Sequence, residues 1–267
     1  MSLKAVRDQD ASMRLLGNML LRRRIPNGLL FWGPGGVGKR LAAVETAKAI
    51  HCRERENDAC DACLSCRKVA AGNHPDVVFL APVSKSRIIT VEMVRSMTEL
   101  ATLRPFESDW RVFIIQDAER MGVPAQNHFL KTLEEPPGNS LFILVSESPG
   151  LLLPTIRSRC QRIRFGALRP ETVAELLERT RDLPPDTARA IAAVAQGQMS
   201  RALDLVDTDK REVVVAVARQ LSEGADPLAL AEDFADRLNQ RREEIKTALK
   251  AEMDSEAYKE ATREDRE

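Results

Sequence analysis

The stretch "GLLFWGPGGVGKR" (28–40) decides the fold, because an apolar run leads directly into a glycine-rich turn and then into a helical pattern. Its spacing follows the P-loop pattern G-x-x-x-x-G-K-[S/T] up to the last letter. In such a loop, backbone N–H groups at a helix N-terminus surround the phosphates of a nucleotide, and the lysine reaches the β and γ phosphates. The residues expected to form this loop are Gly33, Gly35, Gly36, Gly38 and Lys39.

Arg40 occupies the last position of the motif, where a Ser or Thr hydroxyl would bind Mg²⁺. A guanidinium has only donors and a fixed positive charge, so it cannot coordinate the metal. It could instead neutralise a phosphate or pair with a nearby carboxylate. In either case one metal ligand is lost, and we expect a degenerate P-loop.

The strand pattern "RVFII" (111–115) should carry the acidic half of an ATPase site, but two acids are not present there. If the strand ends at Ile115, Gln116 takes the metal-binding position and Asp117 the water-activating position. If the register slips by one residue, Asp117 and Ala118 take these positions. Because neither register supplies both acids, we do not expect this chain to hydrolyse ATP by itself.

Short apolar runs alternate with helical patterns through the first two thirds of the chain. A helix follows the P-loop, a second is expected over 90–103 with Thr90 as its N-cap, and a third is opened by Pro124. Strands that are buried on both faces read as continuous apolar runs. The chain is therefore predicted to be an α/β protein with a five-stranded parallel sheet covered by helices. The expected strands are 28–32, 76–82, 111–115, 141–146 and 161–165.

After Phe165 the strand pattern stops and three short helical patterns follow. Pro170 lies in the first turn of one, and Asp186 is expected to cap the next. The predicted organisation is a P-loop domain over 1–167, a small three-helix domain over 168–208, and a helical region over 209–267.

Four of the five cysteines lie within fifteen residues, in the pattern C-x7-C-x2-C-x2-C. Two overlapping C-x2-C steps give the tight turns that tetrahedral Zn²⁺ requires, and four thiolates would close the site, so the metal would be structural. His51 is a weaker alternative to the first cysteine, and the distant Cys160 is expected to be a small buried residue. The predicted ligands, in a module at about 51–67, are Cys52, Cys60, Cys63 and Cys66.

The charge balance excludes a general electrostatic attraction to nucleic acid, because 40 basic residues are matched by 40 acidic ones. Any DNA contact would have to be local or shared with partners. No apolar run approaches the roughly 20 residues of a membrane span, and the N-terminus has no signal-like apolar segment. We expect a cytoplasmic protein without membrane contact, in which clustered cysteines indicate metal rather than disulfides.

Two further segments, "NHFLKTLEEPP" (127–137) and "LPTIRSRCQRIRF" (153–165), are highly specific. Together with the loop and the cysteines, they resemble the AAA+ clamp-loader subunits of bacterial DNA polymerase III, over about residues 10–208. The hydrolysing gamma and tau members have G-K-[S/T] and a D-E pair. The departures at Arg40 and at Gln116-Asp117 therefore resemble the non-hydrolysing delta-prime branch.

The resemblance implies roles for single residues. Arg159, in "SRC", would be an arginine finger that acts in trans on the ATP of a neighbouring subunit. Arg201 matches the second-sensor position on the helical lid, and Glu147 stands where active relatives have a polar first-sensor residue. ATP or ADP would bind non-productively, if at all.

The implied partners are the gamma/tau and delta subunits, and the sliding clamp and primer-template DNA through the assembled complex. The family also has a C-terminal helical collar that holds the ring of subunits together. The part of this chain after residue 208 is shorter than that collar. Either the collar is abbreviated or the sequence is truncated.

The sequence is also compatible with two rival functions. One is a self-sufficient ATP-hydrolysing motor of the gamma/tau kind that tolerates Arg40. The other is a zinc-dependent DNA-binding module, which the zero net charge disfavours.

Overall fold

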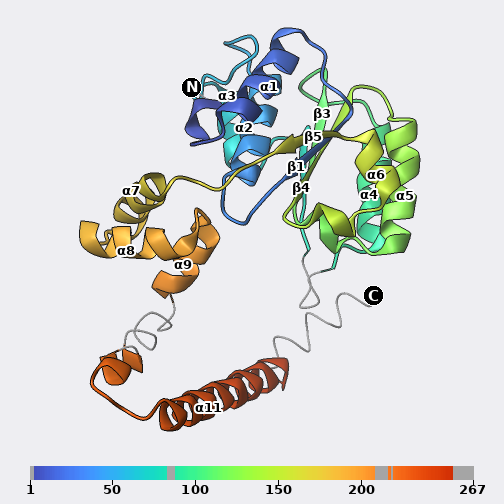
Figure 1. Ribbon diagram of the computed structural model, residues 1–267. Coiled ribbons are helices and arrows are strands. Elements are labelled where there is room, and N and C mark those ends of the chain that lie inside the picture. Colours follow the sequence, from blue (N-terminus) through green and yellow to red (C-terminus); the bar gives the residue numbers. More distant parts are fainter. Residues whose placement is uncertain (1–2, 83–87, 208–215, 218, 255–267) are drawn as a thin grey trace. The chain divides into compact units, whose positions relative to one another are not determined.

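A parallel sheet forms the centre of the protein, with the strand order β2-β3-β4-β1-β5 and every neighbouring pair parallel (Figure 1). The computed structural model describes residues 3–82, 88–207, 216–217 and 219–254. The predicted five-stranded parallel sheet is therefore confirmed. Its strands are β1 (Gly28–Trp32), β2 (Val77–Leu80), β3 (Arg111–Ile115), β4 (Ser140–Ser146) and β5 (Gln161–Arg164).

Helices cover both faces of this sheet (Figure 1). On one face lie α1 (Asp10–Leu21), α2 (Lys39–His51) and α3 (Leu64–Ala70), and on the other lie α4 (Val91–Thr102), α5 (Val123–Glu134) and α6 (Pro154–Arg159). The structure also has short 3-10 helices, labelled η1 (Leu3–Ala5), η2 (Ala118–Arg120) and η3 (Pro149–Leu151). Thr90 caps α4 as predicted, because its side chain accepts a hydrogen bond from the N–H of Met93.

Aromatic side chains hold the sheet against α5. Phe113 on β3 and Phe142 on β4 stack with ring centroids 4.9 Å apart, and Phe129 of α5 meets Phe142 edge-on at 5.3 Å. All three rings are completely buried. Burial of each contributes about 1.5–3 kcal/mol, and the paired geometry adds to it, so the strands and their ends are rigidly placed.

A buried carboxylate fixes the loop that leads into β3. Asp76 is fully buried just before β2, and its oxygens accept hydrogen bonds from the N–H groups of Phe106 at 2.6 Å, Glu107 at 2.7 Å and Ser108 at 3.1 Å. The guanidinium of Arg111 lies 3.5 Å away. Burial by itself would raise the pKa of Asp76, but these backbone donors outweigh it and hold the pKa below its ordinary value.

The chain divides into two compact units, Met1–Asp204 and Leu205–Glu267. The first contains the sheet domain and most of a three-helix set, α7 (Pro170–Arg181), α8 (Pro185–Ala195) and α9 (Met199–Asp207). The second contains α11 (Pro227–Asp254). The domain boundary expected at 208–209 lies outside the described residues.

The cap predicted for α8 was wrong in detail. Pro184 holds the cap position, and Asp186 lies within the first turn, where it pairs with Arg189 at 2.6 Å. Pro185 explains the shift, since proline suits the first helical position and sets where the helix begins.

Replacement of Asp76 by alanine should lower the free energy of unfolding by about 3–5 kcal/mol, because it leaves buried N–H donors and Arg111 without their acceptor. The lowered folded pKa means that this stability is present above the unfolded pKa of about 3.9 and is lost as the pH falls. Urea titrations at pH 7 and at pH 3, below the unfolded pKa, measure both effects. Asp109→Ala, an exposed change in the same loop, is the control, and equal losses in the two variants would contradict the assignment.

Candidate functional site

The glycine-rich loop has a backbone that favours glycine at three positions. It joins the carboxyl end of β1 to α2, and Gly33, Gly36 and Gly38 have φ values of 149°, 70° and 93°. A Cβ atom added to Gly33 would lie 2.2 Å from the carbonyl oxygen of Phe165. The predicted P-loop therefore has the required setting, with a strand before it and a helix N-terminus after it.

Lys39 is held by the loop itself. Its side chain is only 5% exposed, and Nζ donates to the carbonyl oxygens of Gly33 at 2.8 Å and Pro34 at 2.5 Å. These are the donors that a P-loop lysine offers to phosphates. A nucleotide would have to displace these internal hydrogen bonds.

Three carboxylates act electrostatically on this lysine. Burial lowers the pKa of Lys39, while the negative charges of Glu147, Glu119 and Asp117 act in the opposite direction. Glu119 also accepts a hydrogen bond at 3.0 Å from the backbone N–H of Glu147. Since phosphates carry the same sign of charge, these acids disfavour a nucleotide that has no metal beside it. Sequence reasoning missed Glu119, although its place four residues after Ile115 was visible in "IIQDAE".

Gln116 and Arg40 are the two residues that stand where Mg²⁺ ligands would be expected. Strand β3 ends at Ile115, so Gln116 comes directly after it and Asp117 adopts a left-handed backbone with φ of 47°. This corresponds to the first of the two registers considered. Arg40 is exposed on the first turn of α2, and within the described part of the chain its side chain has no ion pair with a carboxylate.

The start of α9 lies directly on the glycine-rich loop. A Cβ atom added to Gly36 would lie 2.2 Å from the backbone nitrogen of Ser200, and one on Gly35 would lie 2.6 Å from its Oγ. The neighbouring Arg201 donates to Oε1 of Gln196 at 3.0 Å, within the helical domain. The lid therefore touches the loop through Ser200, while the predicted second-sensor arginine is bonded to the lid itself.

Arg159 lies at the opposite end of β1 from the loop. It is the last residue of α6, and its carbonyl oxygen is 3.4 Å from a Cβ atom built on Gly28, where β1 begins. The loop follows Trp32, where β1 ends. At about 3.3 Å per residue, the five steps from Gly28 to Gly33 separate the two sites by roughly 16 Å.

The Arg159 side chain is oriented by two acceptors. Its Nη2 atom is 2.6 Å from Oε1 of Glu134, and Nη1 donates to the carbonyl oxygen of Thr155 at 3.2 Å. Arg159 and Glu134 are 37% and 48% exposed, so this ion pair contributes little to stability and acts mainly on orientation. Glu134 belongs to the sequence pattern "KTLEEPP", but that pattern does not predict its contact with Arg159.

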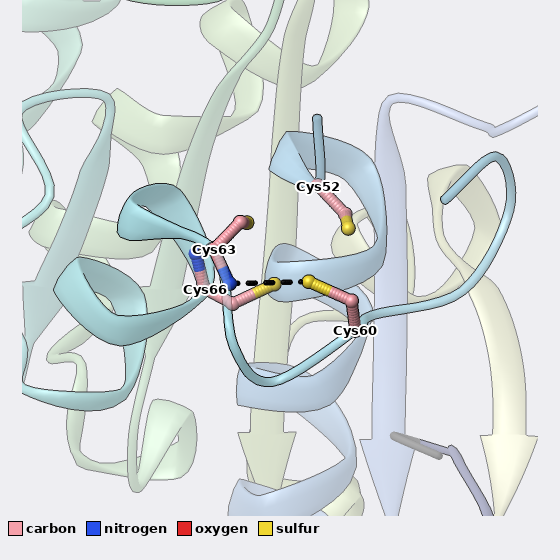
Figure 2. Close-up of side chains that lie close together, drawn as sticks. All are labelled: Cys52, Cys60, Cys63 and Cys66. Carbon is pink, nitrogen blue, oxygen red and sulfur yellow. Dashed lines mark hydrogen bonds between the residues drawn. The ribbon is translucent and has the colours of Figure 1, made fainter. Parts of the chain in front are cut away.

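The four clustered cysteines come together as predicted (Figure 2). Cys52 follows α2, Cys60 lies in the connecting loop, and Cys63 and Cys66 come from the start of α3. Their sulfur atoms all lie within 4.8 Å of one another. Four sulfurs bound at 2.3 Å to a tetrahedral zinc would be about 3.8 Å apart, so the donor set fits a metal ion of this kind.

Backbone donors support the sulfurs. The N–H of Cys63 donates to Sγ of Cys60 at 3.2 Å, and the N–H of Cys66 donates to Sγ of Cys63 at 3.4 Å. Burial alone would raise the pKa of Cys63, but the N–H groups of Cys66 and Arg53 outweigh it and lower the pKa to about 6. Burial raises the pKa of Cys66 to about 12. Thiolate character, which metal binding requires, is thus already favoured at Cys63.

His51 is outside this cluster. Its ring packs against that of His74, tilted by 32° with centroids 4.5 Å apart, and both ring nitrogens are buried without a hydrogen-bond partner. Burial lowers the pKa of His51 to about 4, so it is neutral at pH 7. Cys160 is buried, as expected. In the residues that the structure covers, no helix has both the length and the apolar character needed to cross a bilayer.

Comparison with known proteins agrees with this geometry. The family described as "DNA polymerase III, delta subunit" matches residues 8–169. The DNA polymerase III subunit delta' of Bacillus subtilis is 34% identical over 203 residues, which cover 76% of this chain and 60% of that protein. Subunit tau of the same organism is 31% identical over 205 residues, covering 74% of this chain and 36% of that protein.

The chain thus spans about 60% of the length of its delta' relative. Among solved structures, the RuvB Holliday junction branch migration motor of Thermotoga maritima matches with a TM-score of 0.51 at 16% identity, over 80% of this chain and 66% of that one. This likeness shows the AAA+ P-loop fold. The family match and the identity to subunit delta' together show that the chain belongs to the delta-prime family of bacterial DNA polymerase III clamp-loader subunits.

Proposed function

We propose that this protein is a non-hydrolysing, delta-prime-like subunit of the DNA polymerase III clamp loader, which helps to load the sliding clamp onto DNA. The observation that carries the proposal is the separation of Arg159 from the chain's own glycine-rich loop by the length of β1. An arginine at the amino end of a parallel strand cannot serve a nucleotide bound at its carboxyl end. It is free to serve a nucleotide on a neighbouring subunit.

The expected absence of hydrolysis rests on three features of the nucleotide site. Arg40 and Gln116 stand where two Mg²⁺ ligands would be needed, and neither side chain is a carboxylate or hydroxyl. Lys39 donates hydrogen bonds to the loop's own carbonyls and feels the negative charge of three carboxylates. Any ATP or ADP that enters would be bound without a complete metal site, and so non-productively.

In the assembled loader, Arg159 would stabilise the charge that develops on the γ-phosphate of a neighbouring gamma/tau subunit. An arginine finger of this kind accelerates nucleotide hydrolysis by about 10³–10⁵-fold. Glu134 and Thr155 would hold the guanidinium in place before the subunits meet. The delta subunit would be a further partner, with the clamp and primer-template DNA reached through the complex in the bacterial cytoplasm.

Zinc is the metal that we propose for the cysteine cluster. Four thiolates suit Zn²⁺ and leave no open position for a water nucleophile, so the ion would be structural. It would tie the end of α2 to the start of α3 through Cys52, Cys63 and Cys66.

The leading rival is a hydrolysing motor of the gamma/tau kind, because the chain is also 31% identical to subunit tau. A zinc-dependent DNA-binding module is a third candidate, and the zero net charge disfavours it. The first two candidates differ in one measurable property, the turnover of ATP by the isolated chain.

The isolated chain should show no ATP turnover above the blank, because two metal ligands are missing. A coupled-enzyme assay with and without DNA measures this, and Lys39→Ala controls for contaminating ATPases. Turnover that disappears in Lys39→Ala would establish the motor instead.

Elemental analysis should find about one zinc per chain, the content of one closed four-thiolate site. Cys63→Ser should lose most of this zinc and lower the melting temperature, while Cys160→Ala, outside the cluster, should keep the zinc. Zinc retained by Cys63→Ser at the wild-type level would refute the ligand assignment.

Arg159→Ala should slow ATP turnover at the neighbouring site by about 10³–10⁵, seen as loss of that site's share of the loader's total turnover. The measurement uses loader reconstituted with gamma/tau and delta, and gel filtration checks that assembly is intact. Arg179→Ala, an exposed arginine on α7, is the control. Unchanged turnover in Arg159→Ala would reduce the residue to a structural one.

A further inference from the structure

Three arginines gather on the outer edge of the sheet, in what we call the arginine pocket. It is a cavity of about 560 Å³ between α6 and β5, lined by Arg157, Arg162, Arg164 and Trp32 among others. Among the residues that the structure describes, no carboxylate lines it. The chain as a whole has equal numbers of basic and acidic residues, so three cations without an acid are a local feature rather than a consequence of composition.

The register of the sheet brings these side chains together. Strand β5 is an edge strand, and within the described residues it pairs only with β1, where Arg162 lies opposite Leu30 and Arg164 opposite Trp32. Residues two apart on a strand share a face and lie about 6.6 Å apart. Arg162 and Arg164 therefore project on one face, while Ile163 between them is buried on the other.

The guanidinium groups have donors to spare. Across the residues that the structure describes, no ion pair engages Arg157, Arg162 or Arg164. The Nε atom of Arg157 is buried and has no hydrogen-bond acceptor. Arg164 lies over the ring of Trp32 at 5.5 Å, a contact that can hold the guanidinium in place while the donors in its plane stay available.

We propose that the arginine pocket binds linked phosphate groups. Guanidinium forks match phosphate oxygens in geometry as well as in charge. A single carboxylate would neutralise one of the three cations, whereas a row of phosphates can meet all of them and supply an acceptor for Arg157. Two sources share this chemistry, the backbone of a single-stranded nucleic acid and the polyphosphate tail of a nucleotide.

Binding is measured on the full chain carrying Lys39→Ala, which removes the glycine-rich loop as a competing phosphate site. The probes are a labelled 15-residue oligothymidylate, read by fluorescence anisotropy, and tripolyphosphate, read by calorimetry. A Trp110→Phe background leaves Trp32 as the single tryptophan, so its emission reports occupancy of the pocket itself. The measurement does not require Arg159 to act in trans, so it is independent of the proposed function.

At least one probe should bind with a Kd of about 10⁻⁴–10⁻⁶ M at physiological salt and change the emission of Trp32. For the oligonucleotide, three phosphate contacts predict a slope of log K against log salt of about −2. Replacement of Arg157, Arg162 and Arg164 by glutamine should weaken binding at least tenfold and flatten this slope. The matched control, Arg14, Arg22 and Arg24 replaced by glutamine on and just after α1, loses the same charge and should change binding less than twofold.

Binding of the oligonucleotide alone would identify a nucleic-acid backbone as the source, and binding of tripolyphosphate would identify a nucleotide tail. Binding of neither probe would overturn the proposal. So would equal losses in the two triple variants, since that result reflects net charge rather than a pocket. Circular dichroism and zinc content show that each variant is folded.

Discussion

The parallel pairing of β1 between β4 and β5 is the constraint on which the rest of the structure depends. Parallel strands give a sheet two chemically different ends, because every strand presents its carboxyl end on the same side. The glycine-rich loop and its acidic neighbours are on that side, after β1, β3 and β4. Arg159 lies just before β5, at the amino end of the strands. The length of one strand therefore separates the glycine-rich loop from this arginine within a single chain.

Charge then gives the two ends opposite roles. At the carboxyl end, Lys39 is compensated by Glu147, Glu119 and Asp117, and its ammonium is bonded within the loop. At the amino end, Arg159 is oriented by Glu134 but remains over a third exposed. The first arrangement suits a loop that keeps its shape without phosphate. The second suits a donor that is ready for an acceptor from outside the chain.

Most of the fold could be predicted because the signals were local. Strands β1 and β3 were placed to the residue by apolar runs between glycine and polar breaks, and Thr90 was recognised as a cap from its own side chain. The cap of α8 was wrong because Asp186 and Pro185 compete for neighbouring positions, and proline determines where a helix begins. The order of the strands could not be predicted from local patterns, since it depends on packing between segments far apart in the chain.

The sequence by itself determined which chemical groups are present: the glycine-rich turn, the arginine and glutamine in place of metal ligands, and four cysteines at metal-binding spacing. These are properties of residue type and spacing, which the chain carries whatever its fold. Only the tertiary structure decided their neighbours, such as Glu134 beside Arg159, Ser200 on Gly36, and the acid-free pocket at β5. The physical reason is that charge, burial and close approach depend on distances between residues up to 168 positions apart in sequence, and these are fixed only when the sheet and its helices pack.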